Sequence, residues 1–283
     1  LEYLATVILW AWLGDLAPVE IRGGFIGVRE CCMLIARIAG MLAAGGFSWI
    51  WNEFAPPNQA WISYSLPAGI AAALMMAAIL PLARMPDPHE TTAKPRSVLY
   101  DLFAPLSDAR MRWLLAFGIW FSLANGLTQS AQYLFPIIAF GLPLLMLNIY
   151  RSGMRLGQAA LAPWVGSIVD QLGNRSVLIV SQLIVATGPL FFLLAGAIRG
   201  EDDPTVLPTA LCWVALSGAW VAWIAYVGLN VGLPNLMLKL AGPNFKASYV
   251  AWYFAVTGVT YGLSAIAGGA LYQWLSDVKP TWV

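Results

Sequence analysis

The ten residues GSIVDQLGNR, Gly166–Arg175, form a short polar link between two long apolar stretches. The stretch before the link covers about residues 141–168, and the stretch after it covers about 176–198. Each is longer than the roughly 20 residues that an α-helix needs to cross a bilayer. The link therefore predicts a tight turn at a membrane surface, with an acidic residue, Asp170, between two glycines.

Apolar segments of similar length run along the rest of the chain. Eight can be recognised, at about residues 1–14, 24–51, 60–83, 112–138, 141–168, 176–198, 206–233 and 247–275. Hydrophobic residues make up 60% of the sequence and charged residues only 10%, whereas an average soluble domain has about 25% charged residues. The pattern predicts an all-α, polytopic transmembrane helical bundle, in which internal Pro and Gly are tolerated.

Basic residues gather in alternate links between these segments. One side of the predicted membrane holds only Arg199 and Lys279. The other side holds Arg22, Arg84, Lys94, Arg96, Arg110, Arg112, Arg175, Lys239 and Lys246. By the positive-inside rule, the links 15–23, 84–111, 169–175 and 234–246 lie in the cytoplasm. We expect a multi-pass protein of the cytoplasmic membrane of a bacterium.

The composition disfavours several classes of function. A formal net charge of +1 offers no basis for binding nucleic acid. The three cysteines, Cys31, Cys32 and Cys212, do not have the spacing of metal ligands. No nucleophile–base set and no phosphate-binding loop can be recognised. We therefore expect neither an enzyme nor a bound cofactor or metal.

Two parts of the chain are related by a shift of 224 residues. Arg22 falls on Lys246, two small residues follow in both copies, and an aromatic residue, Phe25 or Tyr249, comes next. A chance match of apolar segments produces this order less easily than it produces a shared run of small residues. Both copies begin at the predicted cytoplasmic face, so we interpret them as a parallel repeat, as between the two halves of a transporter.

The link quoted first also carries a motif. Gly166, Asp170, Gly173 and Arg175 fit the pattern G-x-x-x-D-x-x-G-x-[RK]. Together with the repeat and the charge alternation, the link resembles the motif loop of the major facilitator superfamily of secondary transporters. Positions 171 and 174 depart from the family, which often has Arg there. In that family the motif follows helix 2 and, in weaker form, helix 8; three long segments follow this copy, which identifies it as the second.

The resemblance implies an incomplete two-bundle architecture. Residues 1–84 would supply the end of helix 4 and helices 5 and 6 of the N-terminal six-helix bundle, residues 85–111 the cytoplasmic central loop, and residues 112–283 helices 7 to 11 of the C-terminal bundle. Helices 1 to 3 and helix 12 are expected outside this sequence. In the family, helices 1, 2, 4, 5, 7, 8, 10 and 11 surround a central path. We expect a monomer.

Polar side chains follow single faces of the segments that the resemblance assigns to the path. Ionisable groups at membrane depth face the protein interior, which makes each a candidate for function. The candidates for substrate contact are Arg37, Asn125, Gln129, Gln132, Asn148, Arg151, Arg155, Gln158, Tyr253 and Thr257. Glu30 is the candidate for proton coupling. The alternative is that such groups only join helices to one another, or that Arg37 pairs with an acid on another helix.

The three embedded arginines make the predicted path basic, and guanidinium groups bind carboxylate and phosphate well. We expect a secondary active transporter of a small anionic or polyhydroxylated solute, which works by alternating access and is coupled to a proton or a sodium ion. Two alternatives stay open: a multidrug exporter of the same fold, and a non-transporting membrane sensor.

A second polar link, PVEIRGGFIG at residues 18–27, is expected to meet the motif loop. The resemblance implies that Asp170 faces the start of the helix after this link, where free N–H groups bind a carboxylate. Small residues would allow a close approach, and an ion pair from Arg22 to Asp170 would add to it. The predicted inner-gate residues are Arg22, Gly23, Gly166, Asp170, Gly173, Arg175 and Lys246. Plain loop chemistry is the alternative, and Lys246 is expected to meet a loop outside this sequence.

Overall fold

The structure is a computed structural model that describes residues 2–59, 61–84, 98–142, 144–199, 210–241 and 245–277. These residues form helices joined by short turns, and no strand occurs among them. The helices are α1 (Glu2–Leu16), α2 (Arg22–Phe54), α3 (Ile62–Ala77), α4 (Ile79–Ala83), α5 (Val98–Ser107), α6 (Ala109–Phe140), α7 (Leu144–Leu172), α8 (Asn174–Arg199), α9 (Ala210–Ala222), α10 (Tyr226–Leu240) and α11 (Lys246–Asp277), with 3-10 turns η1 (Pro57–Gln59) and η2 (Trp223–Ala225). The predicted all-α class is confirmed for this part of the chain.

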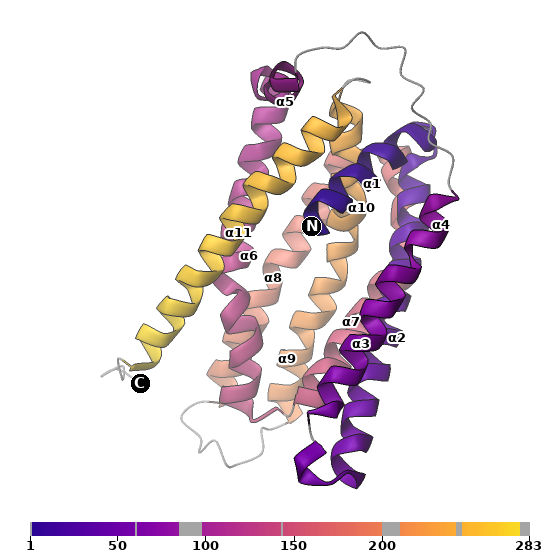
Figure 1. Cartoon of the computed structure of the whole chain (residues 1–283). Coiled ribbons are helices and arrows are strands. Elements are labelled where there is room, and N and C mark those ends of the chain that lie inside the picture. The colour runs from indigo at the N-terminus through magenta and orange to yellow at the C-terminus, as the bar shows by residue number, and fades with distance from the viewer. Residues whose placement is uncertain are drawn as a thin grey trace.

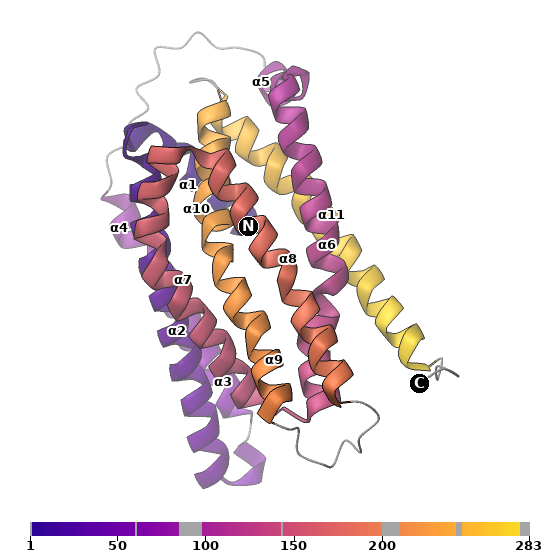
Figure 2. The same ribbon diagram turned by 180° about the vertical axis from the view of Figure 1, so that it is seen from behind.

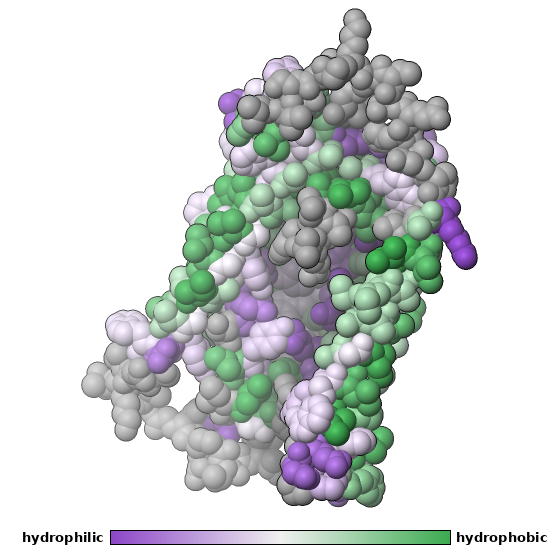
Figure 3. All heavy atoms as spheres, viewed as in Figure 1, coloured by the Kyte–Doolittle hydropathy of each residue, from purple (hydrophilic) through white to green (hydrophobic). Residues whose placement is uncertain are grey.

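Five stretches of helix in the described part are long and apolar enough to cross a membrane: Arg22–Phe54, Ile62–Pro81, Asn174–Arg199, Ala210–Leu240 and Lys246–Trp274. They support an integral membrane protein. α6 and α7 are also long, with 32 and 29 residues, but they carry the predicted polar faces, which sets them apart from the simple apolar spans. Figure 3 shows hydrophobic side chains over the outer sides of α11 and of α2 and α3.

The long helices lie side by side in three groups (Figures 1 and 2). α2, α3 and α7 form one side of the molecule, α6 and α11 form the other, and α8, α9 and α10 lie between them. α2 packs along α7, α6 packs along α11, and α8 packs against α9 and α10. The contacts of α2 with α7 and of α6 with α11 therefore join segments that are far apart in the sequence.

The helix boundaries follow the predicted repeat. α1 ends at Leu16 and α10 at Leu240, while α2 begins at Arg22 and α11 at Lys246, so that both pairs of boundaries are 224 residues apart. α2 and α11 also have nearly equal lengths, 33 and 32 residues. Both copies thus have the same arrangement of helix, link and helix, with a basic residue at the first position of the second helix.

Two predicted segments have different boundaries in the structure. The segment predicted at 60–83 is divided at Ala78, because Pro81 has no N–H to donate to the helical ladder. The segment predicted to end at 233 continues as α10 to Leu240, with Pro234 inside the helix. The prediction of a loop from 234 is therefore wrong, and Lys239 lies in the last turn of α10.

The predicted central loop, 85–111, contains a helix. Residues 85–97 lie outside the described part, α5 occupies 98–107, and Asp108 caps the start of α6. The Asp108 carboxylate accepts hydrogen bonds from the Tyr249 hydroxyl at 2.6 Å and from the Arg110 backbone N–H at 2.8 Å, and these bonds lower the pKa of Asp108. The Trp252 indole donates to the Leu102 carbonyl at 2.7 Å. α5 is thereby held against α11, and the prediction of a loop is wrong over 98–107.

Candidate functional site

A cavity of about 270 Å³ lies between α6, α7, the η2 region and α11. Its size is near the lower end of the roughly 300–1,000 Å³ range of small-molecule sites. The lining residues are Phe121, Ser122, Asn125, Gln129, Gln132, Tyr133, Leu147, Arg151, Met154, Trp220, Trp223, Tyr226 and Tyr261. Four predicted substrate-path residues are thus brought together: Asn125, Gln129, Gln132 and Arg151. Figure 3 shows the molecule hollowed between α11 and α2, with hydrophilic side chains in the hollow.

The amides of α6 reach the cavity because they recur at intervals of three and four residues, which places them on one face of the helix. The Asn125 side-chain oxygen accepts a hydrogen bond from the Tyr226 hydroxyl. The Gln132 amide donates to Thr128 Oγ1 at 2.9 Å. The Gln129 side chain makes no hydrogen bond within the described residues, so its donors and its acceptor are available to a ligand.

Arg151 reaches the same cavity from α7. Its guanidinium carbon lies 4.0 Å from the centroid of the Tyr133 ring, and the guanidinium also donates to the Tyr133 hydroxyl. This contact orients the group but uses only part of its five N–H donors. No acid forms an ion pair with Arg151 in the described part of the chain. The remaining donors can therefore bind an anion.

Besides Tyr133, five aromatic residues that the sequence did not single out line the cavity: Phe121, Trp220, Trp223, Tyr226 and Tyr261. The ring centroid of Phe121 lies 6.2 Å from that of Tyr226, and both rings line the cavity. Trp220 stacks on Tyr150 at 4.7 Å. In an apolar membrane segment such residues cannot be told from lipid-facing ones by sequence alone, because both kinds have the same composition.

Several residues that were predicted to line the substrate path instead take part in helix packing or lie away from the cavity. Gln158 is buried and donates to the Trp223 carbonyl at 2.8 Å, so it joins α7 to η2. Tyr253 and Thr257 are buried where α11 packs closely on Gly118 of α6. Asn148 is half-buried and does not line the cavity. In this conformation Gln158, Tyr253 and Thr257 belong to the helix packing and do not line the cavity, and their contact with a substrate stays a prediction.

Arg155 does not line the cavity, although Arg151 on the same helix does. Arg155 is half-buried and interacts electrostatically with Arg37 and with Glu30 of α2. Glu30 is buried and accepts a hydrogen bond from the Asn230 amide at 3.2 Å. The predicted polar face of α7 is thus divided between two groups of residues.

The motif loop binds the start of α2, as the resemblance implied. The backbone N–H groups of Gly23 and Gly24 donate to the two carboxylate oxygens of Asp170, each at 2.8 Å. These amides lie in the first turn of α2, where the helix supplies no carbonyl partner, and the partial positive charge of a helix N-terminus attracts a carboxylate. Asp170 therefore caps α2 from a residue almost 150 positions away in the chain.

Glycines allow α2 and α7 to approach this closely. A Cβ atom at Gly23 would lie 2.6 Å from an Asp170 oxygen, and one at Gly166 would lie 2.3 Å from the Gly23 carbonyl oxygen. A Cβ at Gly27 would lie 2.3 Å from the carbonyl oxygen of Ala162. Gly173 directly follows the last residue of α7. Its φ of 85° is a left-handed conformation that favours glycine.

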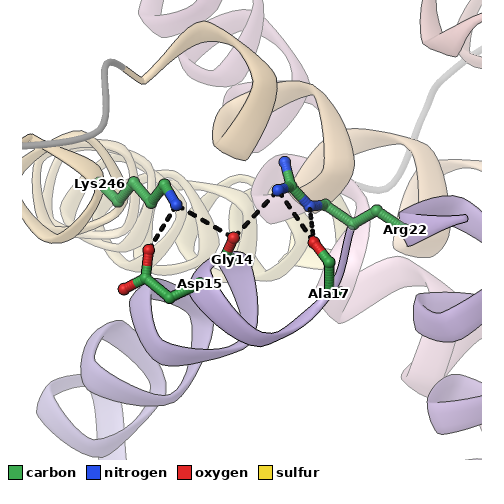
Figure 4. Close-up of polar contacts among 5 residues, drawn as sticks. All are labelled: Gly14, Asp15, Ala17, Arg22 and Lys246. Carbon is green, nitrogen blue, oxygen red and sulfur yellow. Dashed lines mark hydrogen bonds and ion pairs between the residues drawn. The ribbon is translucent and has the colours of Figure 1, made fainter. Parts of the chain in front are cut away.

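Two basic residues converge on the end of α1 (Figure 4). The Arg22 guanidinium donates to the carbonyls of Gly14 at 3.0 Å and Ala17 at 3.1 Å. From the other side, the Lys246 ammonium donates to the same Gly14 carbonyl at 3.0 Å and forms an ion pair with Asp15 at 2.5 Å. The residues that the repeat makes equivalent thus share one acceptor. The expectation that Lys246 meets a loop outside this sequence is wrong.

The expected ion pair from Arg22 to Asp170 is also wrong, and the gate role of Arg175 stays a prediction. Within the described residues no ion pair joins Arg22 to Asp170, because the end of α1 supplies closer acceptors to the Arg22 guanidinium. Arg175 is exposed at the start of α8 and makes no hydrogen bond or ion pair in the described part.

Comparisons of the chain with protein-family models, with curated proteins and with solved structures found no match. The features of the molecule that bear on function are therefore the cavity, the charged groups beside it and the contacts at the end of the bundle.

Proposed function

We propose that the protein is a secondary active transporter that moves a small anionic or polyhydroxylated solute across the membrane by alternating access. The observation that carries the proposal is the cavity among membrane helices, in which Arg151 and the free amide of Gln129 lie together. Polar and charged groups at membrane depth are costly, so a cavity lined by them suggests a polar cargo.

The chemistry of the lining supports this class of solute. Arg151 has donors left for a carboxylate or phosphate after its contact with Tyr133. Amides of α6 can donate to and accept from hydroxyl groups. The aromatic rings around them offer flat apolar surfaces for the carbon skeleton of the solute.

The contacts at the predicted cytoplasmic end support a gate. Asp170 of α7 binds the start of α2, and Lys246 of α11 binds the end of α1. Both contacts are polar and lie at one end of the helices, so their formation and loss can accompany a movement that separates the helices at this end. On this proposal they close the path on one side while it is open on the other.

The aromatic lining also favours a second candidate, a multidrug exporter with a lipophilic solute. Phe121, Trp220 and Trp223 would suit such a solute. Arg151 opposes lipophilic cations, because a like charge at the site repels them. The sign of the solute's charge therefore separates the two candidates.

The proposal is tested with the full-length protein in sealed vesicles with an imposed ion gradient. Uptake is measured for labelled organic anions, sugars and the lipophilic cation tetraphenylphosphonium. For the transported anion or sugar, we expect Arg151→Ala to lower uptake roughly tenfold or more, because a hydrogen bond to a charged group contributes about 1.5–3 kcal/mol. Arg151→Lys should retain part of the activity, because it keeps the charge but loses the planar fork.

The matched control is Arg112→Ala, which removes an exposed arginine at the start of α6 that does not line the cavity. It should leave uptake unchanged. Unchanged uptake in both Arg151 variants would end the role of Arg151 in solute binding. Binding of a solute without any flux would identify a sensor, and transport of the cation alone would identify the exporter.

A further inference from the structure

A second group of charged side chains lies next to the cavity. Glu30 of α2 is buried and accepts a hydrogen bond from the Asn230 amide of α10 at 3.2 Å. Arg37 and Arg29 of α2 and Arg155 of α7 all interact with Glu30 electrostatically. One buried carboxylate is therefore attracted by three guanidinium groups, none of which forms an ion pair with it in the described part of the chain, and the group has an excess of positive charge.

The donors of these arginines are not satisfied by the described part of the chain. Arg155 Nε and Arg29 Nη1 are buried and have no hydrogen-bond partner among the described residues. Arg155 is also repelled by Arg37 and by Arg151. Excess charge inside a membrane and unpaired buried donors are both unfavourable. An anion bound here would relieve both.

The position of this group suits a solute in the cavity. Arg155 lies one helical turn beyond Arg151 on α7, a rise of about 6 Å. We propose that Arg155, Arg37 and Arg29 bind the carboxylate or phosphate group of the solute in competition with Glu30, and that Glu30 takes up a proton when the anion binds. The inference rests on the proposed function and narrows its solute to small carboxylates and phosphates.

The uptake of a proton by Glu30 follows from the charges around its carboxylate. Without an anion, the ionised carboxylate of Glu30 is attracted by the three arginines and accepts a hydrogen bond from the Asn230 amide. When an anion takes the arginines, an ionised Glu30 is left beside a second negative charge, and like charges disfavour the ionised form. Anion affinity therefore rises as the pH falls, by up to about tenfold per pH unit where Glu30 titrates.

In the described part of the chain, the elements packed on α2 carry one other acid, Asp170 of α7, and it is already bound by two backbone N–H groups at the start of α2. α7 contributes the cations Arg151 and Arg155, and α10 contributes the uncharged Asn230. α3, which also packs on α2, has no charged residue. The pH dependence is therefore assigned to Glu30.

The test measures binding, so that it does not depend on whether the protein transports. Acetate, succinate or inorganic phosphate is added to the purified full-length protein in weakly buffered detergent solution. Affinity is measured by calorimetry, and proton uptake is measured with a pH-indicator dye. The wild-type protein should take up about one proton per anion for at least one of these probes. Glu30→Gln should bind that anion without proton uptake and with an affinity independent of pH.

Variants of the arginines locate the site. Arg155→Gln should lower the affinity roughly tenfold or more, because it removes a charge-assisted pair. Arg155→Lys should recover part of it, which separates loss of charge from misfolding. Arg112→Gln, at an exposed position away from the group, should change the affinity by less than about twofold.

Three results would overturn the proposal: none of the three anions binds with proton uptake, proton uptake persists in Glu30→Gln, or Arg151→Gln abolishes binding while Arg155→Gln does not. A protein that binds the anion with a proton but moves no solute in vesicles would support this subsite and refute the transporter.

Discussion

Replacing Asp170 by Asn tests the contact between α7 and α2 directly. The N–H groups of Gly23 and Gly24 donate to separate carboxylate oxygens of Asp170, at 2.8 Å each. Asparagine has a single acceptor oxygen, and its NH₂ group would face one of the two N–H donors. At least one of the two bonds is therefore lost, together with the negative charge opposite the helix N-terminus.

The magnitude follows from the kind of bond. A hydrogen bond to a charged group contributes about 1.5–3 kcal/mol, and the lower part of this range applies to a partly buried contact. A loss of about 2 kcal/mol corresponds to a roughly thirtyfold shift of the equilibrium toward separated helices. This shift should also change the balance between the two access states and therefore the rate of uptake.

Hydrogen exchange detected by mass spectrometry measures the contact, because Asp170 is the partner of the Gly23 and Gly24 amides. We expect exchange of these two amides to become roughly thirtyfold faster in Asp170→Asn. Glu20→Gln is the matched control, since it removes an exposed acid from the same link. Unchanged exchange in Asp170→Asn, or an equal increase in Glu20→Gln, would refute the reasoning.

Two further predictions concern helix packing and the end of α1. Gly27→Ala would place a Cβ 2.3 Å from the Ala162 carbonyl oxygen. It should lower the free energy of unfolding in detergent by about 1–3 kcal/mol. Gly40→Ala is the control and should leave this free energy unchanged, because its Cβ meets nothing within 4 Å in the described part. A double-mutant cycle with Lys246→Met and Asp15→Asn should give a coupling energy of about 0.5–1 kcal/mol, because the two side chains are 17% and 22% exposed. A coupling near zero would show that this ion pair does not stabilise the closed end.

The positions of most helices were predictable because they depend on local properties of the chain. A run of apolar residues long enough for the bilayer forms a helix whatever its neighbours are, and turn residues end it. α5 was missed because a short helix against other helices has no such length, although Leu102 and Phe103 pack on the start of α11. The partners of polar groups were less predictable. The spacing of polar residues shows which of them share a face of a helix, but it does not show which other helix packs against that face.

The sequence by itself determined the all-α class, the repeat of 224 residues and the polar face of α6, because these follow from periodicity. The meeting of Asp170 with the start of α2 was implied by the resemblance that the motif carries, and the structure shows it. Only the tertiary structure decided the rest. It assigned Arg22 and Lys246 to a shared carbonyl, and it separated Arg151 in the cavity from Arg155 beside Glu30. The physical reason is that a flexible basic side chain binds whichever acceptor the packed helices bring within reach. The distance between the side chain and that acceptor depends on helix packing and is not encoded in local sequence.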